Sequence, residues 1–108
     1  MNEIIVSADE QTFNEEVLKS DKLVLVEFWT TWCSTCKMLL PINSYIKNKY
    51  NDKLKIVKVN VDENIDIVSE YEVMSVPTVL AFKEGKKVAS ITGIRPKEIF
   101  EEMVQKHL

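Results

Sequence analysis

The chain has 108 residues, of which 45% are hydrophobic, enough for one domain that buries roughly two-thirds of the surface its unfolded chain exposes. Its 17 acidic and 14 basic residues give a formal net charge of -3 and are dispersed, which argues against a nucleic-acid surface and a polybasic membrane anchor. Residues 1–20 lack the basic start and long apolar core of a signal peptide, and no apolar run approaches membrane length. We therefore expect one cytoplasmic domain spanning residues 1–108.

The first half of the chain predicts two strands and two helices. Residues 3–6 form a short apolar strand, and Asp9 is a candidate N-cap for a helix with apolar side chains on one face. Residues 23–29 predict a strand buried on both faces, because apolar side chains occupy both alternating sets of positions. The helix predicted over residues 34–50 contains Pro41, which should kink it; two helices meeting there are the alternative.

The second half predicts three more strands and two more helices. Residues 54–61 form a buried strand and residues 65–71 a short helix, while residues 78–83 and 87–92 form a hairpin around Gly85. Pro96 opens the last helix. Its apolar face should pack on the sheet, and its other face should stay in solvent. The first face comprises Ile99, Phe100, Met103 and Val104, and the second Glu98, Glu101, Glu102 and Lys106.

The order of these elements, βαβαβαββα, defines the α/β fold class that we expect. Parallel strands need crossover connections, whereas the last two strands can close through a hairpin. The prediction is a mixed five-stranded sheet covered on both faces by four helices. Ligands of such sheets gather beyond the carboxyl ends of the strands, which is where residue 33 would project.

The only two cysteines, Cys33 and Cys36, lie where the buried strand 23–29 passes into the following helix. Unpaired backbone N–H groups and the positive end of the helix dipole favour a thiolate there, so the pair indicates redox chemistry. A closed zinc site is the alternative, but it needs four ligands and only the distant His107 could join the cysteines. We expect no metal and no cofactor. His107 lies in the last helical turn, where an exposed histidine near the negative end of the helix dipole needs no metal to explain it.

Four features, in this order, resemble the thioredoxin family over nearly the whole chain. They are Trp32-Cys33-x-x-Cys36-Lys37 after an apolar strand, Pro41 in the next helix, Val76-Pro77-Thr78 before a strand, and Gly93 before the last helix. The resemblance implies the thioredoxin fold and thiol-disulfide oxidoreductase activity. It also implies that Cys33 is the exposed attacking thiolate, with a lowered pKa, and Cys36 the buried thiol that resolves the mixed disulfide.

Glu27 is the one charged residue of strand 23–29. The resemblance implies that it is the family's buried acid, usually an aspartate, which assists proton transfer to and from the resolving cysteine. A solvated residue near a strand end is the alternative. Lys58 in the next strand would be its counter-charge if it lies beside Glu27, and an ordinary edge lysine otherwise.

Pro77 and Trp32 belong to an implied substrate surface. The resemblance implies a cis bond between Val76 and Pro77, which would let the Val76 backbone pair with an extended peptide; a strand-start proline is the alternative. Trp29 lies inside the strand and is expected in the core, whereas core packing is the alternative for Trp32. The predicted substrate-binding residues are Trp32, Ser34, Thr35, Val76, Pro77, Gly93 and Ile94.

One departure from the family bears on function: Ser34-Thr35 stands where thioredoxins usually have Gly-Pro, which leaves the reduction potential open. We expect a monomeric general protein disulfide reductase with disulfide-containing client proteins and a thioredoxin reductase as electron donor. Nucleic acid and membrane are not expected partners. A thiol oxidase or disulfide isomerase is the second hypothesis, and the lack of a signal sequence counts against it. A docking module with incidental thiols is the third.

Overall fold

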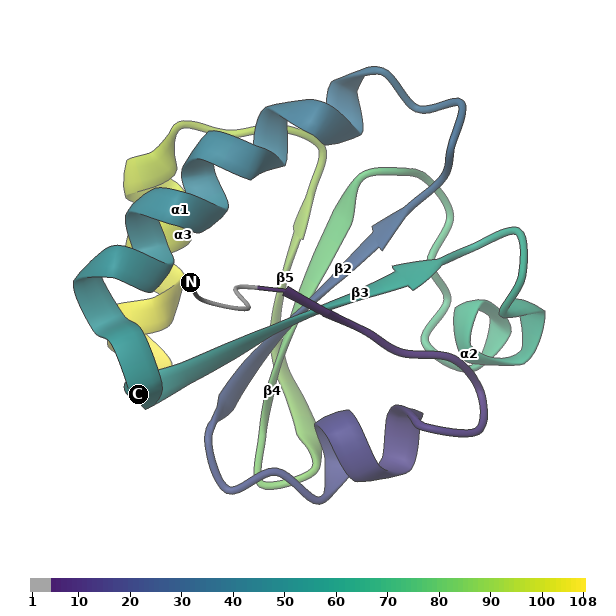
Figure 1. The fold of residues 1–108 in the computed structure, drawn as a ribbon, viewed down its shortest axis with the longest axis horizontal. Coiled ribbons are helices and arrows are strands. Elements are labelled where there is room, and N and C mark those ends of the chain that lie inside the picture. The colour runs from purple at the N-terminus through teal and green to yellow at the C-terminus, as the bar shows by residue number, and fades with distance from the viewer. Residues whose placement is uncertain (1–4) are drawn as a thin grey trace.

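Five strands form one mixed sheet in the computed structural model, which describes residues 5–108 (Figure 1). The strands are β1 (Ile5–Ser7), β2 (Leu23–Trp29), β3 (Leu54–Asn60), β4 (Thr78–Lys83) and β5 (Lys86–Thr92). They lie in the order β1-β3-β2-β4-β5; β1 and β2 run parallel to β3, and β4 runs antiparallel to β2 and β5. A mixed five-stranded sheet whose last two strands form a hairpin is as predicted. Residues 3 and 4 of the predicted first strand lie outside the described residues.

Four helices cover the two faces of the sheet. Figure 1 shows α1 (Leu39–Tyr50) and α3 (Lys97–His107) together on one side, with α2 (Ile65–Glu70) and the short π-type helix η1 (Asn14–Leu18) on the other. Each face has its own apolar cluster, with side chains from α1 and α3 in one and from η1 and α2 in the other. The predicted fold class is therefore confirmed. No helix within residues 5–108 is both long enough and apolar enough to span a bilayer.

Strand β2 lies at the centre of the sheet and supplies both clusters. Its alternate side chains Val24, Val26 and Phe28 pack with η1 and α2, whereas Leu23 and Leu25 pack with α1 and α3. Side chains alternate between the faces of a strand, so Glu27 points to the same side as Leu25, toward α1. The strand pattern thus decides which helix covers the carboxyl group.

The helical segment after the cysteines is divided in two. A 3₁₀ turn (Thr35–Met38, η2) leads directly into α1, which begins at Leu39. Pro41 is the third residue of α1, in a first turn whose N–H groups have no partner within the α-helix. The α-helical part of the predicted segment 34–50 thus begins only at Leu39, so Pro41 lies in a first turn rather than in a helix interior, and the change of helix type precedes the proline.

Helix α3 has a different buried face from the one predicted. Phe100, Met103 and Val104 are buried as expected, but Glu101 is buried as well and Ile99 is 41% exposed. The reason is that α3 packs against α1 in addition to the sheet. Glu101 faces α1, where it accepts hydrogen bonds and pairs with a lysine, so this acidic residue is on the inside.

Candidate active site

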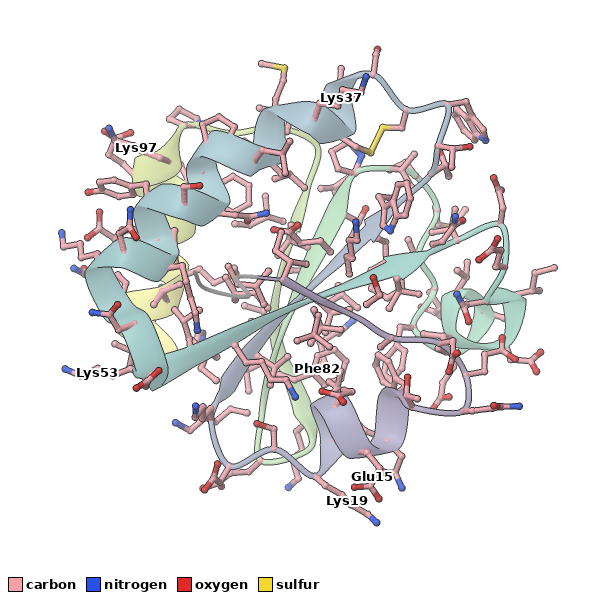
Figure 2. The ribbon with its side chains drawn as sticks, in the orientation of Figure 1. Glu15, Lys19, Lys37, Lys53, Phe82 and Lys97 are labelled. Carbon is pink, nitrogen blue, oxygen red and sulfur yellow. A yellow bond between two sulfur atoms is a disulfide. The ribbon has the colours of Figure 1, made fainter. Side chains whose placement is uncertain are left out.

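Cys33 and Cys36 form a disulfide in the segment between β2 and α1. Figure 2 shows this bond in yellow near Lys37, where the chain enters its helical segment. Their Cα atoms are 5.4 Å apart, an ordinary separation for bridged cysteines. The Cys36 backbone N–H donates to Cys33 Sγ at 3.2 Å, and the Thr35 hydroxyl lies 3.5 Å from the same sulfur. Two polar groups thus approach Cys33 from its own turn.

The two cysteines differ in exposure within the disulfide. Cys33 is 8% exposed and counts as buried, whereas Cys36 is partly buried. Cys33, which we expect to be the exposed thiol of the reduced pair, is thus the more buried cysteine of this disulfide form. The Cys33 sulfur lies within its own turn, 3.2 Å from the Cys36 backbone nitrogen.

A cavity of about 200 Å³ brings the redox pair and the buried acid together. We call it the thiol cavity. Cys33 and Cys36 line it, together with Glu27 from β2 and Lys58 from β3. Thr30 lines it as well, and the hydroxyl of this buried residue has no hydrogen-bond partner among residues 5–108. The cavity has room for water, which occupies about 30 Å³ per molecule in the liquid.

Glu27 is buried, at 5% exposure, so the alternative of a solvated residue is wrong. Its Oε1 accepts a hydrogen bond from Nδ2 of Asn43 in α1 at 2.9 Å. Burial raises the pKa of Glu27 to about 7, against the smaller opposing effects of the Asn43 hydrogen bond and the Lys58 charge. A carboxyl group with this pKa can accept and return a proton near neutral pH.

Lys58 lies beside Glu27, as the counter-charge interpretation requires. The two residues are register partners in the parallel pair of β2 and β3. The Lys58 ammonium nevertheless lies over the ring of Trp29, 4.8 Å from its centroid, and no ion pair joins it to Glu27 among residues 5–108. Lys58 therefore lowers the pKa of Glu27 through its charge without a direct contact. Trp29 is only partly buried because it forms a wall of the thiol cavity.

Trp32 lies on the surface beside a second cavity, of about 210 Å³, which we call the Trp32 cavity. Trp32 is 70% exposed, and its ring N–H donates to Asp62 Oδ2 at 3.0 Å. Val76 and the almost fully exposed Met74 line the same cavity. Two of the predicted substrate-binding residues, Trp32 and Val76, thus share one apolar hollow.

Pro77 has the predicted cis bond to Val76. Its carbonyl oxygen accepts a hydrogen bond from the Gly93 N–H at 2.8 Å, which ties the segment before β4 to the end of β5. Gly93 and Ile94 are partly buried, and neither lines the two cavities described above. Ser34 and Thr35 are exposed beside the disulfide. The predicted substrate residues therefore surround the redox pair without forming one continuous cavity.

Sequence reasoning missed three residues of this region: Asn43, Asp62 and Thr30. A signal existed for Asn43, which lies four residues after Leu39 and three before Ile46, on the apolar face of its helix. Nothing local marks Asp62, because its partner Trp32 is 30 residues away. Among the described residues, no group of three or more His, Cys, Asp or Glu side chains is arranged to hold a metal ion.

A disulfide at the junction of a central strand and a helix, next to a buried acid of raised pKa, defines a thiol-disulfide oxidoreductase site. The thioredoxin family model matches residues 4–106. The chain is 45% identical over 104 residues to a thioredoxin of Bacillus subtilis, covering 96% of this chain and 98% of that protein. It is 44% identical over 99 residues to thioredoxin 1 of a Nostoc species, covering 92% of each. It is 46% identical over 97 residues to a thioredoxin of Griffithsia pacifica, covering 90% of this chain and 89% of that protein.

The chain belongs to the thioredoxin family. It is accordingly a thiol-disulfide oxidoreductase, a disulfide reductase whose redox pair is Cys33 and Cys36.

Proposed function

We propose that the chain acts as a general protein disulfide reductase in which Cys33 attacks and Cys36 resolves. The observation that carries this assignment is the pair of donors around Cys33 Sγ, the Cys36 N–H and the Thr35 hydroxyl, which favour a thiolate on that sulfur. Disulfide-containing proteins are the clients, and a thioredoxin reductase is the electron donor. The protein acts as a cytoplasmic monomer, a single domain over residues 1–108.

The reaction has two displacements. The Cys33 thiolate attacks one sulfur of a client disulfide, forming a mixed disulfide and releasing one client thiolate. Glu27, ionised at the start of the second step, takes the proton of Cys36 through the thiol cavity. The Cys36 thiolate then attacks Cys33 Sγ, which forms the Cys33–Cys36 bond and releases the second client thiolate. Two electrons pass from the dithiol to the client, and the released thiolates take up two protons.

The client docks over the surface around the redox pair. The exposed indole of Trp32 and the side chains of Val76 and Met74 offer apolar contact, and the Val76 backbone can pair with an extended client segment. Ser34, Thr35, Pro77, Gly93 and Ile94 complete the proposed binding surface. Lys58 assists Glu27 by favouring its ionised form.

Two serine variants test the order of attack. Cys33→Ser should abolish turnover, whereas Cys36→Ser should accumulate a mixed disulfide with the client, because only the resolving step is lost. Non-reducing electrophoresis and mass spectrometry after mixing with an oxidised protein client detect the adduct. Trapping by Cys33→Ser instead would reverse the assignment. A protein that keeps its cellular role with both cysteines replaced would be a docking module rather than a reductase.

A further inference from the structure

Asn43 is a buried amide that no step of the proposed reaction uses. It is 4% exposed and lies on the face of α1 that carries the core residues Leu39 and Ile46. An amide removed from water costs free energy unless it is hydrogen-bonded. A polar residue among apolar neighbours therefore needs a partner, and the partner here is Glu27.

The hydrogen bond from Asn43 uses one carboxyl oxygen of Glu27 and does not involve the other. Asn43 Nδ2 donates to Glu27 Oε1 at 2.9 Å. Within residues 5–108, Glu27 Oε2 has no hydrogen bond. Among the same residues, only the Thr30 hydroxyl is both fully buried and without a hydrogen-bond partner. Oε2 is therefore not fully enclosed. Glu27 lines the thiol cavity together with Cys36, and Oε2 is the carboxyl oxygen that Asn43 does not occupy.

We propose that Asn43 is a positioning residue for the resolving step, which anchors Glu27 through Oε1 and leaves Oε2 free to exchange a proton with Cys36. This inference rests on the proposed role of Glu27. An amide suits the task because it has both a donor and an acceptor. It donates N–H to the carboxylate, and after rotation its oxygen can accept the O–H of the protonated acid, so the anchor serves both states of the reaction.

The other charged and titratable groups around Glu27 are few. Lys58 approaches from β3, and Lys37 and the two cysteines come from the segment between β2 and α1. The β4 partner of Glu27 is the apolar Val79. The Asn43 hydrogen bond and the Lys58 charge both lower the pKa of Glu27, against the larger effect of burial. Removing the amide should therefore raise that pKa further.

The test is Asn43→Leu, which removes the hydrogen bond while keeping a side chain of similar size. Carbon-13 NMR of the Glu27 carboxyl group should show its titration midpoint rising by about one pH unit. The ionised fraction at pH 7 would then fall from about one-half to about one-tenth, so release of the second client thiol should slow about fivefold. The difference should shrink above about pH 9. Attack by Cys33 on a peptide disulfide should be unchanged.

Matched variants separate positioning from general damage. Asn48 is exposed on the same helix, so Asn48→Leu should leave the midpoint and both rates unchanged. Asn43→Ala repeats the test if the leucine variant does not fold. In a Glu27→Gln background, Asn43→Leu should slow the resolving step no further, since the two residues act through one contact.

Each outcome decides one claim. An unchanged or lower Glu27 midpoint in the Asn43 variants, or further slowing in the Glu27→Gln background, overturns the positioning role. If Glu27→Gln itself leaves the resolving step unaltered, the proposed proton transfer fails. If Glu27→Gln slows that step but Asn43→Leu does not, the inference about Asn43 fails and the proposed function stands.

Discussion

Glu27 links catalysis to stability at the scale of a single residue. A carboxyl group is normally ionised at neutral pH, but burial raises the pKa of Glu27 from its usual 4.5 to about 7. The folded protein therefore binds this proton more tightly than the unfolded chain does. The contribution of Glu27 to the free energy of unfolding therefore falls as pH rises from about 4.5 to 7 and levels off above that range. The same property that suits Glu27 to proton transfer is a source of instability.

Glu27→Gln should remove this pH dependence, because the amide does not ionise. The variant should gain stability relative to the original protein as pH rises, by about 3 kcal/mol in total between pH 4.5 and pH 8. Chemical denaturation at several pH values measures the difference. Parallel profiles for the two proteins would show that the pKa of Glu27 is not raised in the folded state.

Thr35 is the second residue whose chemistry can be tested alone. Its hydroxyl lies 3.5 Å from Cys33 Sγ, whereas Ser34 has no hydrogen bond to that sulfur among the described residues. A donor to the thiolate stabilises the reduced form over the disulfide, and hydrogen bonds to charged groups contribute about 1.5 to 3 kcal/mol. At roughly 1.4 kcal/mol per 30 mV, this makes the reduction potential less negative by about 30 to 60 mV.

Replacing Ser34-Thr35 with Gly-Pro should therefore raise the pKa of Cys33 and make the potential more negative by about that amount. Thr35→Val isolates the hydroxyl and should act in the same direction, while Ser34→Ala should change little. Equilibration with glutathione followed by alkylation trapping gives the potential, and thiolate absorbance gives the pKa. An unchanged or less negative potential in the Gly-Pro variant contradicts the idea.

Helices α1 and α3 are joined by one buried acid at the scale of elements. Glu101 in α3 accepts hydrogen bonds from the hydroxyls of Tyr45 at 2.8 Å and Tyr50 at 2.9 Å, and it pairs with Lys49, all three on α1. These donors hold the pKa of Glu101 below its usual value, the Lys49 hydrogen bond most strongly. The stabilisation is therefore present above about pH 4.5 and is lost as pH falls below it.

Glu101→Ala should lower the melting temperature at pH 7 by about 5 °C or more, because three donors lose their shared acceptor. Glu102→Ala is the matched control, since Glu102 is exposed on the same helix and should change the melting temperature by much less. Thermal melts followed by circular dichroism at pH 7 compare the two variants, and melts at pH 3 test whether the effect of Glu101 is lost in acid. A loss of equal size for the two variants would show that the contact with α1 does not stabilise the fold.

The whole molecule is stabilised by two apolar clusters that share the central strands. Ile56 and Val57 are adjacent in β3 and both fully buried, yet they pack on opposite faces of the sheet. Loss of packing on either face should therefore weaken the same central strands. This arrangement favours a single cooperative unfolding transition.

Ile56→Ala should lower the free energy of unfolding by about 2 to 5 kcal/mol, the usual cost of removing a fully buried large side chain. Ile99→Ala makes the same chemical change at a partly exposed position on α3 and should cost less than half as much. Urea denaturation followed by two spectroscopic probes measures both. Transitions that do not coincide would mean that the two clusters unfold separately.

Prediction from sequence succeeded where the signal is local. The strand over residues 23–29 and the turn at Gly85 depend on side-chain period and turn chemistry, and both are present as predicted. The prediction for α3 failed in part at Glu101. Apolar side chains at helical spacing show which face packs on the sheet, but they do not show that a second face contacts another helix. The position of Pro41 was misplaced for a related reason: it was expected inside a helix, but its cost depends on where the helix begins, and α1 begins only two residues before it.

The sequence by itself determined the order of elements, the two-sided burial of β2 and the place of the cysteine pair, because these follow from patterns within a few neighbouring residues. Only the tertiary structure decided the pKa of Glu27, its contact with Asn43 and the burial of Cys33 and Glu101. The partners in these contacts lie as far as 56 residues apart along the chain, as Tyr45 and Glu101 do. Burial and charge act through space, so a carboxyl group in an apolar strand acquires its chemistry only when α1 closes over it.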